Sequence, residues 1–233
     1  MRKRAPSVSF ASLGLLLAFA QHANAAFVSY NANGVSGNAP QWNASTWDFD
    51  CTPLSAIRGS GLGLAGGLNQ FAAFGAATTQ TLNTTNNDYV RFGFTLINAP
   101  SAEYLVTGFK ASVGSFGAGS VGMQYQLWAY LPNAGQQLVP VSSPATMNAP
   151  STNTPVNLTI TNSGIIAFPN QTIELRMYFW GASTAQNGIA FTNADDNATT
   201  PDVEIFAIPI PAPGSVAVGA ACALTSAWRR RRA

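Results

Sequence analysis

The sequence predicts an all-β protein, an antiparallel two-sheet sandwich of the jelly-roll kind. In several segments apolar and polar residues alternate with a period of two, which is the pattern of a strand with one buried face. Stretches rich in Gly, Pro, Asn and Ser separate these segments, and such residues favour turns. No amphipathic helical period stands between them, which favours antiparallel sheets over a helix-covered parallel sheet.

Four long alternating runs predict the main strands. Their expected inward-facing residues are Val90, Phe92, Phe94 and Leu96; Leu105, Phe109, Ala111 and Val113; Met123, Tyr125, Leu127, Ala129 and Leu131; and Ile173, Leu175, Met177 and Phe179. Shorter strands are predicted at residues 27–30, 156–161, 188–191 and 203–208. The Gly- and Ala-rich stretch 59–77 fits either a loop with a helical turn or an irregular strand pair.

The first 25 residues have the three-part plan of a secretory signal peptide. Basic residues at positions 2–4 precede an apolar run over residues 8–20, and Ala23 and Ala25 are the small residues that precede a cleavage site. A membrane anchor is the alternative, but it needs about 20 apolar residues, and this run has 13. We therefore expect cleavage before Ala26.

Residues 209–233 form a second predicted targeting segment. They contain, in order, the motif Pro211-Ala212-Pro213-Gly214-Ser215, an apolar segment at 216–228 and the basic cluster Arg229, Arg230, Arg231 and Arg232. Moving the arginines through a bilayer is costly, so we expect them to stay on the cytoplasmic side with the body outside. At 13 residues, rich in Ala and Gly, the apolar segment is marginal as a permanent span and favours transient anchoring.

This order of motif, apolar segment and terminal arginines resembles the C-terminal sorting signal of PEP-CTERM proteins. The resemblance covers about the last 25 residues and implies recognition by an exosortase, a membrane protease-transpeptidase of Gram-negative bacteria that make exopolysaccharide. Ala212 stands where the family has Glu, a departure that concerns processing more than membrane retention. Residues 173–182 and the closing strand near residue 208 are also similar to the end of many PEP-CTERM bodies, where the resemblance implies no active site.

The predicted body has the opposite net charge to the whole chain. The chain has 11 basic and 9 acidic residues, a net charge of +2, but three of the basic residues lie in the leader and four in the tail. The body keeps Arg58, Arg91, Lys110 and Arg176 with all nine acids, so its net charge is 4 − 9 = −5. Nucleic-acid binding is not expected, because it depends on Lys and Arg contacting phosphates.

Histidine chemistry is excluded from the predicted body, because the single histidine, His22, lies in the leader. Ser-His-Asp or Cys-His catalysis and His-ligated metals are therefore not expected. The sequence also contains no nucleotide-binding loop of Walker or Rossmann type. Glycosidase chemistry needs only two acids, for which Glu103, Glu174 and Glu204 are candidates. Because alternation places Glu174 and Glu204 on a polar face, the sequence predicts a non-enzymatic protein.

Calcium is the one candidate cofactor. Asp195 and Asp196, in a predicted loop, offer the hard oxygen ligands that Ca²⁺ prefers, and Asp48 and Asp50 form a second acidic pair. Asp is equally an ordinary turn residue, and no complete calcium-loop motif is present.

The two cysteines are divided between the body and the tail. Cys51 lies in the body and Cys222 in the apolar segment, so a bridge between them is not expected. We expect Cys51 to be a buried small residue, with an intermolecular bridge or lipidation as alternatives.

A binding hypothesis follows from the same alternation. If Leu127 and Leu175 point inward, the neighbouring aromatic residues point outward. These are Trp128, Tyr130, Tyr178 and Trp180. Exposed aromatic rings beside hydrogen-bonding side chains suit stacking on sugar rings. The alternatives are that a loop or a neighbouring molecule covers the rings, or that they end the hydrophobic core.

The sequence therefore predicts a leader (1–25), a β-sandwich body (26–208) and a sorting tail (209–233). The predicted function is that of a non-enzymatic, exported component of the cell surface or extracellular matrix, transiently anchored in the membrane and handled by an exosortase-type enzyme. The alternative function is that of a carbohydrate-binding module that recognises exopolysaccharide through the aromatic face. A glycoside-active enzyme is a third hypothesis.

Overall fold

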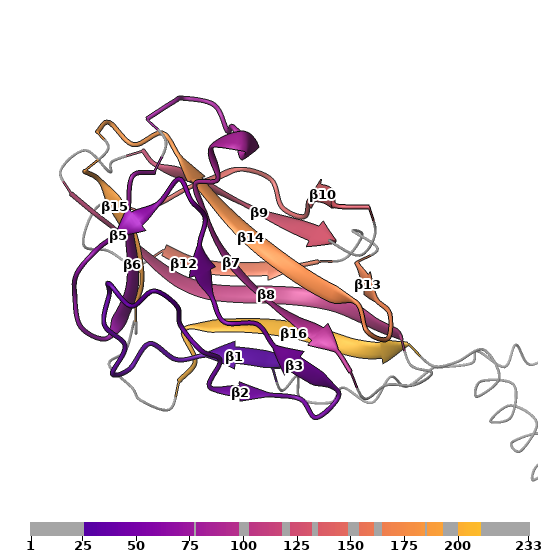
Figure 1. Cartoon of the computed structure of the whole chain (residues 1–233). Helices are drawn as coiled ribbons and strands as arrows, with labels where there is room; N and C mark the ends of the chain where they lie inside the picture. Colours follow the sequence, from indigo (N-terminus) through magenta and orange to yellow (C-terminus); the bar gives the residue numbers. More distant parts are fainter. Residues whose placement is uncertain are drawn as a thin grey trace, which may run out of the picture.

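The protein folds as an all-β sandwich of two antiparallel sheets, which confirms the predicted fold class (Figure 1). The computed structural model describes residues 26–76, 78–97, 103–117, 122–131, 135–148, 154–160, 165–184, 186–192 and 200–210. The predicted leader lies outside these residues, and so does the predicted sorting tail except for residues 209 and 210, which belong to the last strand. The described part contains no α-helix and one 3₁₀ turn, η1 (Thr84–Asn86), and no helix in it is long and apolar enough to cross a membrane.

The first sheet is built around one long strand, β8 (Glu103–Phe116). On one edge β8 pairs with β12 (Thr154–Thr159) and β13 (Ile166–Ala167), and on the other with β16 (Val203–Ile210) and β15 (Gly188–Thr192). The sheet continues beyond β16 with β1 (Val28–Tyr30) and β2 (Thr46–Trp47), and beyond β15 with β6 (Gln70–Phe74) and β5 (Gly63–Leu64). Val113 pairs with residues of both β12 and β15, so these two strands lie on opposite edges of β8.

The second sheet has β14 at its centre, between β7 and β9. The strands of this sheet are β14 (Thr172–Trp180), β7 (Tyr89–Leu96), β9 (Gln124–Leu131), β3 (Cys51–Pro53), β4 (Ile57–Arg58), β10 (Gln137–Pro140) and β11 (Ala145–Thr146). Both β3 and β4 pair with β7, while β10 and β11 pair with β9. The chain crosses between the sheets repeatedly, so strands that are distant in sequence, such as β7 and β14, become neighbours.

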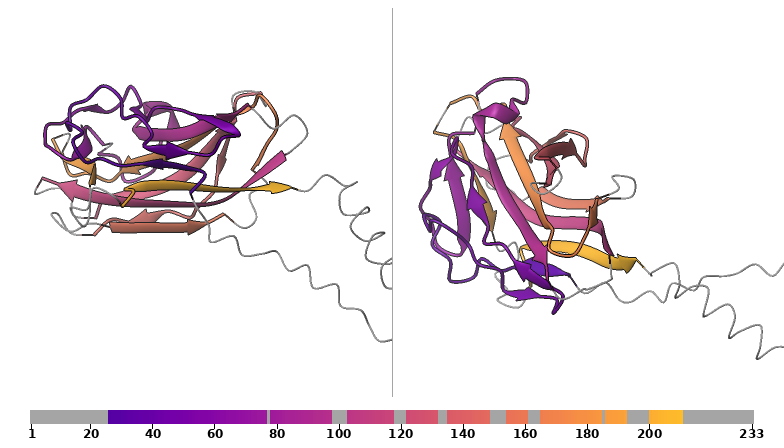
Figure 2. Two further views of the ribbon diagram at one scale, coloured as in Figure 1. Left: turned by 90° about the horizontal axis from the view of Figure 1, so that it is seen from below. Right: turned by 45° about the vertical axis from the view of Figure 1, so that its right-hand side comes forward.

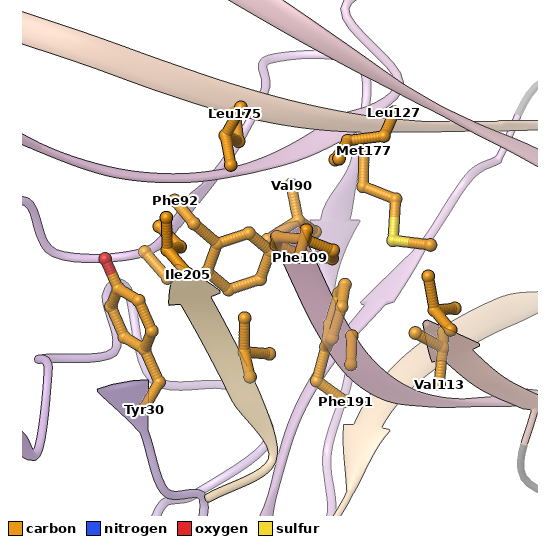
Figure 3. Packing of buried hydrophobic residues seen from close by; sticks show 14 of the residues in the cluster. Tyr30, Val90, Phe92, Phe109, Val113, Leu127, Leu175, Met177, Phe191 and Ile205 are labelled. Carbon is orange, nitrogen blue, oxygen red and sulfur yellow. The ribbon is translucent and has the colours of Figure 1, made fainter. Parts of the chain in front are cut away.

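The core lies between the sheets and is formed by alternate residues of the long strands (Figure 3). Leu127, Leu175 and Met177 from the second sheet point toward Phe109 and Phe191 from the first, and all five are fully buried. Each large apolar side chain buried in this way contributes roughly 1.5–3 kcal/mol. The predicted inward faces of β7, β9 and β14 are confirmed.

Strand β8 changes its buried face part-way along, and here the prediction is partly wrong. Alternation predicts an inward Leu105, but Tyr104 and Val106 are buried and Leu105 is half-buried. The ladder with β16 skips Thr107, which is a β-bulge. One extra residue moves the following side chains to the other face, so the prediction holds again from Phe109 onward.

The Gly- and Ala-rich stretch contains the irregular strand pair, β5 and β6, and Arg58 ties it to the rest of the fold. The Arg58 guanidinium donates hydrogen bonds to the carbonyl oxygens of Ala72, Ala39 and Gly37 at 2.6, 2.7 and 2.5 Å. It also lies 3.7 Å from the centre of the Phe71 ring. One side chain thus joins the loop that contains Gly37 and Ala39 to strand β6.

Tyr30 and Gly93 join the two sheets inside the core. The Tyr30 hydroxyl, from β1, donates to the Leu54 carbonyl oxygen at 2.7 Å and accepts from the Gly93 N–H of β7 at 3.2 Å. Burial raises the pKa of Tyr30 well above its usual range, so the hydroxyl stays protonated as a donor. Gly93 has φ +157°, and a Cβ there would lie 2.1 Å from the Ile173 carbonyl oxygen of β14. Only glycine lets β7 approach β14 at this point.

We expect Gly93→Ala to lower the free energy of unfolding by about 2 kcal/mol or more, because the added methyl group must push β7 away from β14. Gly63→Ala is the matched control, since a Cβ at Gly63, also in a strand, meets no atom within 4 Å. Urea denaturation of both variants measures the difference. Equal stability of the two would contradict the requirement for glycine at position 93.

Candidate functional site

The outer face of the second sheet gathers aromatic rings and ion pairs across β7, β14 and β9. In the strand register Arg176 of β14 lies between Arg91 of β7 and Trp128 of β9. Two residues further along β14, Tyr178 lies opposite Tyr89 of β7. In the other direction Glu174 lies opposite Tyr130. This cross-strand register brings together residues that are up to 89 positions apart in sequence.

Glu174 is the centre of this arrangement. It is 6% exposed, and its carboxylate accepts hydrogen bonds from Arg91 Nη1 at 2.9 Å and from Arg176 Nε and Nη2 at 3.0 and 2.8 Å. The Arg176 guanidinium also lies over the Tyr130 ring at 3.6 Å and the Tyr89 ring at 4.7 Å. Burial lowers the pKa of Arg176, but the hydrogen bonds and charge of Glu174 outweigh this effect and the pKa is raised. Two cations and one anion give the cluster a net charge of +1 within an acidic body.

The four predicted aromatic residues do lie on this outer face, but they differ in exposure. Trp128 and Tyr130 are half-buried, whereas Tyr178 and Trp180 are only 1% and 2% exposed. The expectation that Tyr178 and Trp180 form part of an exposed face is therefore wrong. The other two positions keep partial access to solvent.

Neighbouring rings and a loop account for this burial. The Tyr178 ring packs against Tyr89 and Trp128, with ring centroids 5.1 and 6.2 Å apart. Near Trp180, the Gly181 N–H donates to the Thr79 carbonyl oxygen at 3.1 Å. This bond places the loop that leads through η1 into β7 against the end of β14 (Figure 1). A loop therefore covers the aromatic rings at this end of the face, which is one of the alternatives that the sequence left open.

Two buried N–H groups on this face lack a hydrogen-bond partner among the described residues, Trp128 Nε1 and Arg91 Nε. Leaving a buried donor unsatisfied costs about 1–3 kcal/mol, and most such groups in proteins are paired. An acceptor oxygen from a ligand or from water would satisfy either donor. Sequence alternation identifies Arg91 as outward-facing, but only the strand register places it beside Glu174 and near Trp128.

The three candidate catalytic acids do not come together. Glu174 lies on the outer face of the second sheet, while Glu103 and Glu204 belong to β8 and β16 of the first. The Glu204 carboxylate is 4.0 Å from the Lys110 ammonium. Lys110 is seven residues along β8 from Glu103, which is roughly 23 Å at 3.3 Å per residue. A glycosidase needs its two acids within about 10 Å, so Glu103 and Glu204 do not form such a pair.

The predicted calcium ligands Asp195 and Asp196 lie outside the described residues. Of the second acidic pair, the Asp48 carboxylate accepts the Asp50 N–H at 2.9 Å, and the Asp50 carboxylate accepts the Tyr104 hydroxyl. Burial, together with this hydrogen bond, raises the pKa of Tyr104. The pair therefore caps a turn against β8. Nowhere in the described ranges do three or more His, Cys, Asp or Glu residues gather in a way that could hold a metal ion.

Cys51 is a buried free thiol, as predicted. Its Sγ donates to the Asp48 carbonyl oxygen at 3.5 Å. Burial, with the nearby Asp48 charge, raises the pKa of the thiol from 9.0 to about 12. The thiol is therefore neutral and shielded at physiological pH, which disfavours a bridge or lipidation at this residue.

The predicted processing sites lie mostly outside the described residues. Ala26, expected to be the first residue of the mature protein, is the first described one, while Ala23, Ala25 and the sorting motif 211–215 with its arginines are not described. In class, the protein is an antiparallel β-sandwich with an Arg–Glu–Arg cluster on the outer face of one sheet. No protein-family model matches the chain, and no curated protein is significantly similar to it.

We expect Glu174→Gln to lower the free energy of unfolding by about 2 kcal/mol, because two partly buried arginines lose their shared counterion. Glu204→Gln is the control: its pairing with Lys110 is exposed and 4.0 Å long, so less than about 0.5 kcal/mol is expected. Thermal and urea unfolding of both variants at low and high salt checks this prediction. A loss for Glu174→Gln as small as the one expected for Glu204→Gln would show that the outer cluster contributes little to stability.

Proposed function

We propose that the protein is a non-enzymatic, exported component of the cell surface or extracellular matrix, held transiently at the membrane by its C-terminal tail. The observation that carries this proposal is the tail itself, with its Pro-Ala-Pro-Gly-Ser motif, a 13-residue apolar segment and four closing arginines. The arginines resist translocation, while an apolar segment this short and rich in small residues gives weak retention. Such a segment suits a temporary attachment.

The fold supports separation of the tail from the body. Strand β16 ends at Ile210, and the motif begins at the next residue. Because β16 pairs with both β1 and β8, it is an internal strand of the first sheet and completes the sandwich before the motif starts. Cleavage within the motif would remove no strand of the described fold. We infer that an exosortase-type membrane enzyme is the processing partner, since the tail resembles the signals that such enzymes recognise.

The test compares the full chain with two variants in an exopolysaccharide-producing Gram-negative host, one lacking residues 211–233 and one with all four terminal arginines changed to Gln. For the full chain we expect membrane-associated protein at first, and later a mature form that begins at Ala26 and ends near Pro211. The truncated chain should be exported without a membrane-associated stage, whereas the Gln variant keeps the apolar segment and tests the arginines alone. Cell fractionation and intact mass measure both properties. Recovery of the full chain from cytosol with Met1 and Ala233 intact would contradict the proposal.

A second candidate function is binding of exopolysaccharide at the outer face of the second sheet. It is favoured by Trp128 Nε1, which has no hydrogen-bond partner among the described residues. The indole is half-buried beside Tyr178 and Arg176, but its Nε1 atom is itself buried, so a sugar hydroxyl could accept this N–H only after a neighbouring side chain moved aside. Sugars also stack on aromatic faces. The positive cluster would favour polysaccharides that carry carboxylates.

Titration of the protein with purified exopolysaccharide tests this second function. We expect Trp128→Ala to abolish binding, and Trp128→Phe, which keeps a ring but lacks the N–H, to weaken it by about tenfold, the equivalent of one lost hydrogen bond. Trp47→Phe is the control, because Trp47 is exposed on β2, far from this face. Trp180 is not a useful test position, since its burial makes substitution destabilising. Absence of binding to every polysaccharide tried would remove this function.

A further inference from the structure

The end of the sandwich where the chain leaves β16 is unusually apolar. We call it the exit end and define it by Phe49, Ile97, Phe168 and Ile208. Their exposed fractions are 81%, 43%, 48% and 39%. Among the described residues eight large apolar side chains are exposed, and half of them lie at this end. A fifth, Trp47, is two residues from Phe49 on β2, and the other three lie on or between β5 and β6.

The strand register brings the exit end together. The Ile97 N–H donates to the Asp50 carbonyl oxygen at 2.9 Å, which joins the end of β7 to the segment that carries Phe49. On opposite edges of β8, Tyr104 pairs with Ala167 of β13 and with Pro209 of β16. Phe168 and Ile208 therefore flank the same end of the first sheet. Figure 2 shows the arrow of β16 pointing out of the sandwich at this end.

The length of the linker limits how far this end can be from the apolar segment. Only five residues, 211–215, separate Ile210 from Val216, where the apolar segment begins. The six Cα–Cα steps from Ile210 to Val216 span at most about 22 Å when extended. While the apolar segment is in a bilayer, Ile210 must therefore lie within about 22 Å of the hydrocarbon, which keeps the exit end close to the headgroup layer. The opposite end of the sandwich has no such constraint.

We propose that in the tail-anchored state the exit end rests on the lipid surface, with Phe49 and Phe168 in the boundary between headgroups and acyl chains. Aromatic side chains favour this boundary, where buried apolar area gives the binding energy. The inference rests on the proposed anchoring and adds an orientation to it. The exit end faces the membrane, and the outer face of the second sheet remains accessible to solvent beside the membrane. The short linker and the apolar end act together, because the linker holds the exit end close to the bilayer and so raises the local concentration of lipid around it.

The charges at the exit end select the kind of lipid. Asp48, Asp50 and Glu103 lie beside the apolar side chains. The four basic residues of the described part lie elsewhere. Arg58 is bonded to backbone carbonyl oxygens, Arg91 and Arg176 pair with Glu174, and Lys110 lies opposite Glu204. Anionic headgroups would therefore repel this end, so the occupant is a zwitterionic lipid surface.

The experiment uses the chain from Ala26 to Ala233, in a Trp228→Phe background so that the tail carries no tryptophan. The chain is reconstituted with phosphatidylcholine vesicles whose acyl chains are brominated, and brominated chains quench tryptophans that reach them. Flotation with the vesicles reports anchoring, and quenching of Trp47 emission reports contact of the exit end. Trp47→Phe identifies the part of the signal that comes from Trp47.

We expect the chain to float and Trp47 to be quenched. The double variant Phe49→Ser with Phe168→Ser should reduce this quenching to about half or less while flotation persists, because the tail still anchors it. Leu68→Ser is the matched control: Leu68 is 75% exposed but lies between β5 and β6, and its change should leave quenching unaltered. Replacing part of the phosphatidylcholine with phosphatidylglycerol should also lower the quenching.

The outcomes separate the two proposals. A chain that floats with unquenched Trp47 overturns the lipid contact and leaves the anchoring proposal intact. A chain that does not float overturns both. If Trp47 is unquenched and analytical ultracentrifugation shows a dimer that Phe49→Ser dissociates, the occupant is a second copy of the chain. Equal quenching in the double variant and in Leu68→Ser also contradicts the assignment of these two phenylalanines to the lipid boundary.

Discussion

The structure depends on close apposition of two sheets around one aromatic core, and Gly93 lies where a contact between the sheets meets a close contact within one of them. The Tyr30 hydroxyl of the first sheet meets the Gly93 N–H of the second, while the Ile173 backbone approaches the same residue from β14. A side chain at position 93 would force β7 and β14 apart. Both strands carry much of the inner face of the second sheet, so their spacing affects how the core side chains pack.

The outer face of the second sheet is a consequence of how the inner face is filled. Once Leu175 and Met177 enter the core, Glu174, Arg176 and Tyr178 must point outward from β14. They do not remain separate surface residues, since neighbouring strands bring two arginines to one carboxylate and rings to both sides of Tyr178. The face is therefore partly closed, and its half-buried rings are Trp128 and Tyr130 on β9 and Tyr89 on β7.

The two ends of the sandwich also differ. The loop through η1 is bonded to the end of β14 that carries Trp180, so that end is covered by the chain itself. At the exit end the turns that carry Phe49 and Phe168 leave apolar side chains in solvent. Exposing such groups has a cost in water that contact with lipid would relieve. Under the proposed anchoring, lipid is the nearest candidate for this contact.

The sequence by itself determined the fold class and the inward faces of β7, β9 and β14, because period-two alternation directly encodes which side of a strand is buried. It could not locate the bulge at Thr107, since an extra residue is defined only against the partner strand β16. Trp42 lies outside every predicted strand, yet its ring is buried against Tyr30 and Phe92. Likewise, only the register of three strands decided that Glu174 would be shared by two arginines and that Tyr178 would be covered. Local pattern fixes the side to which a residue points, whereas its neighbours come from distant parts of the chain.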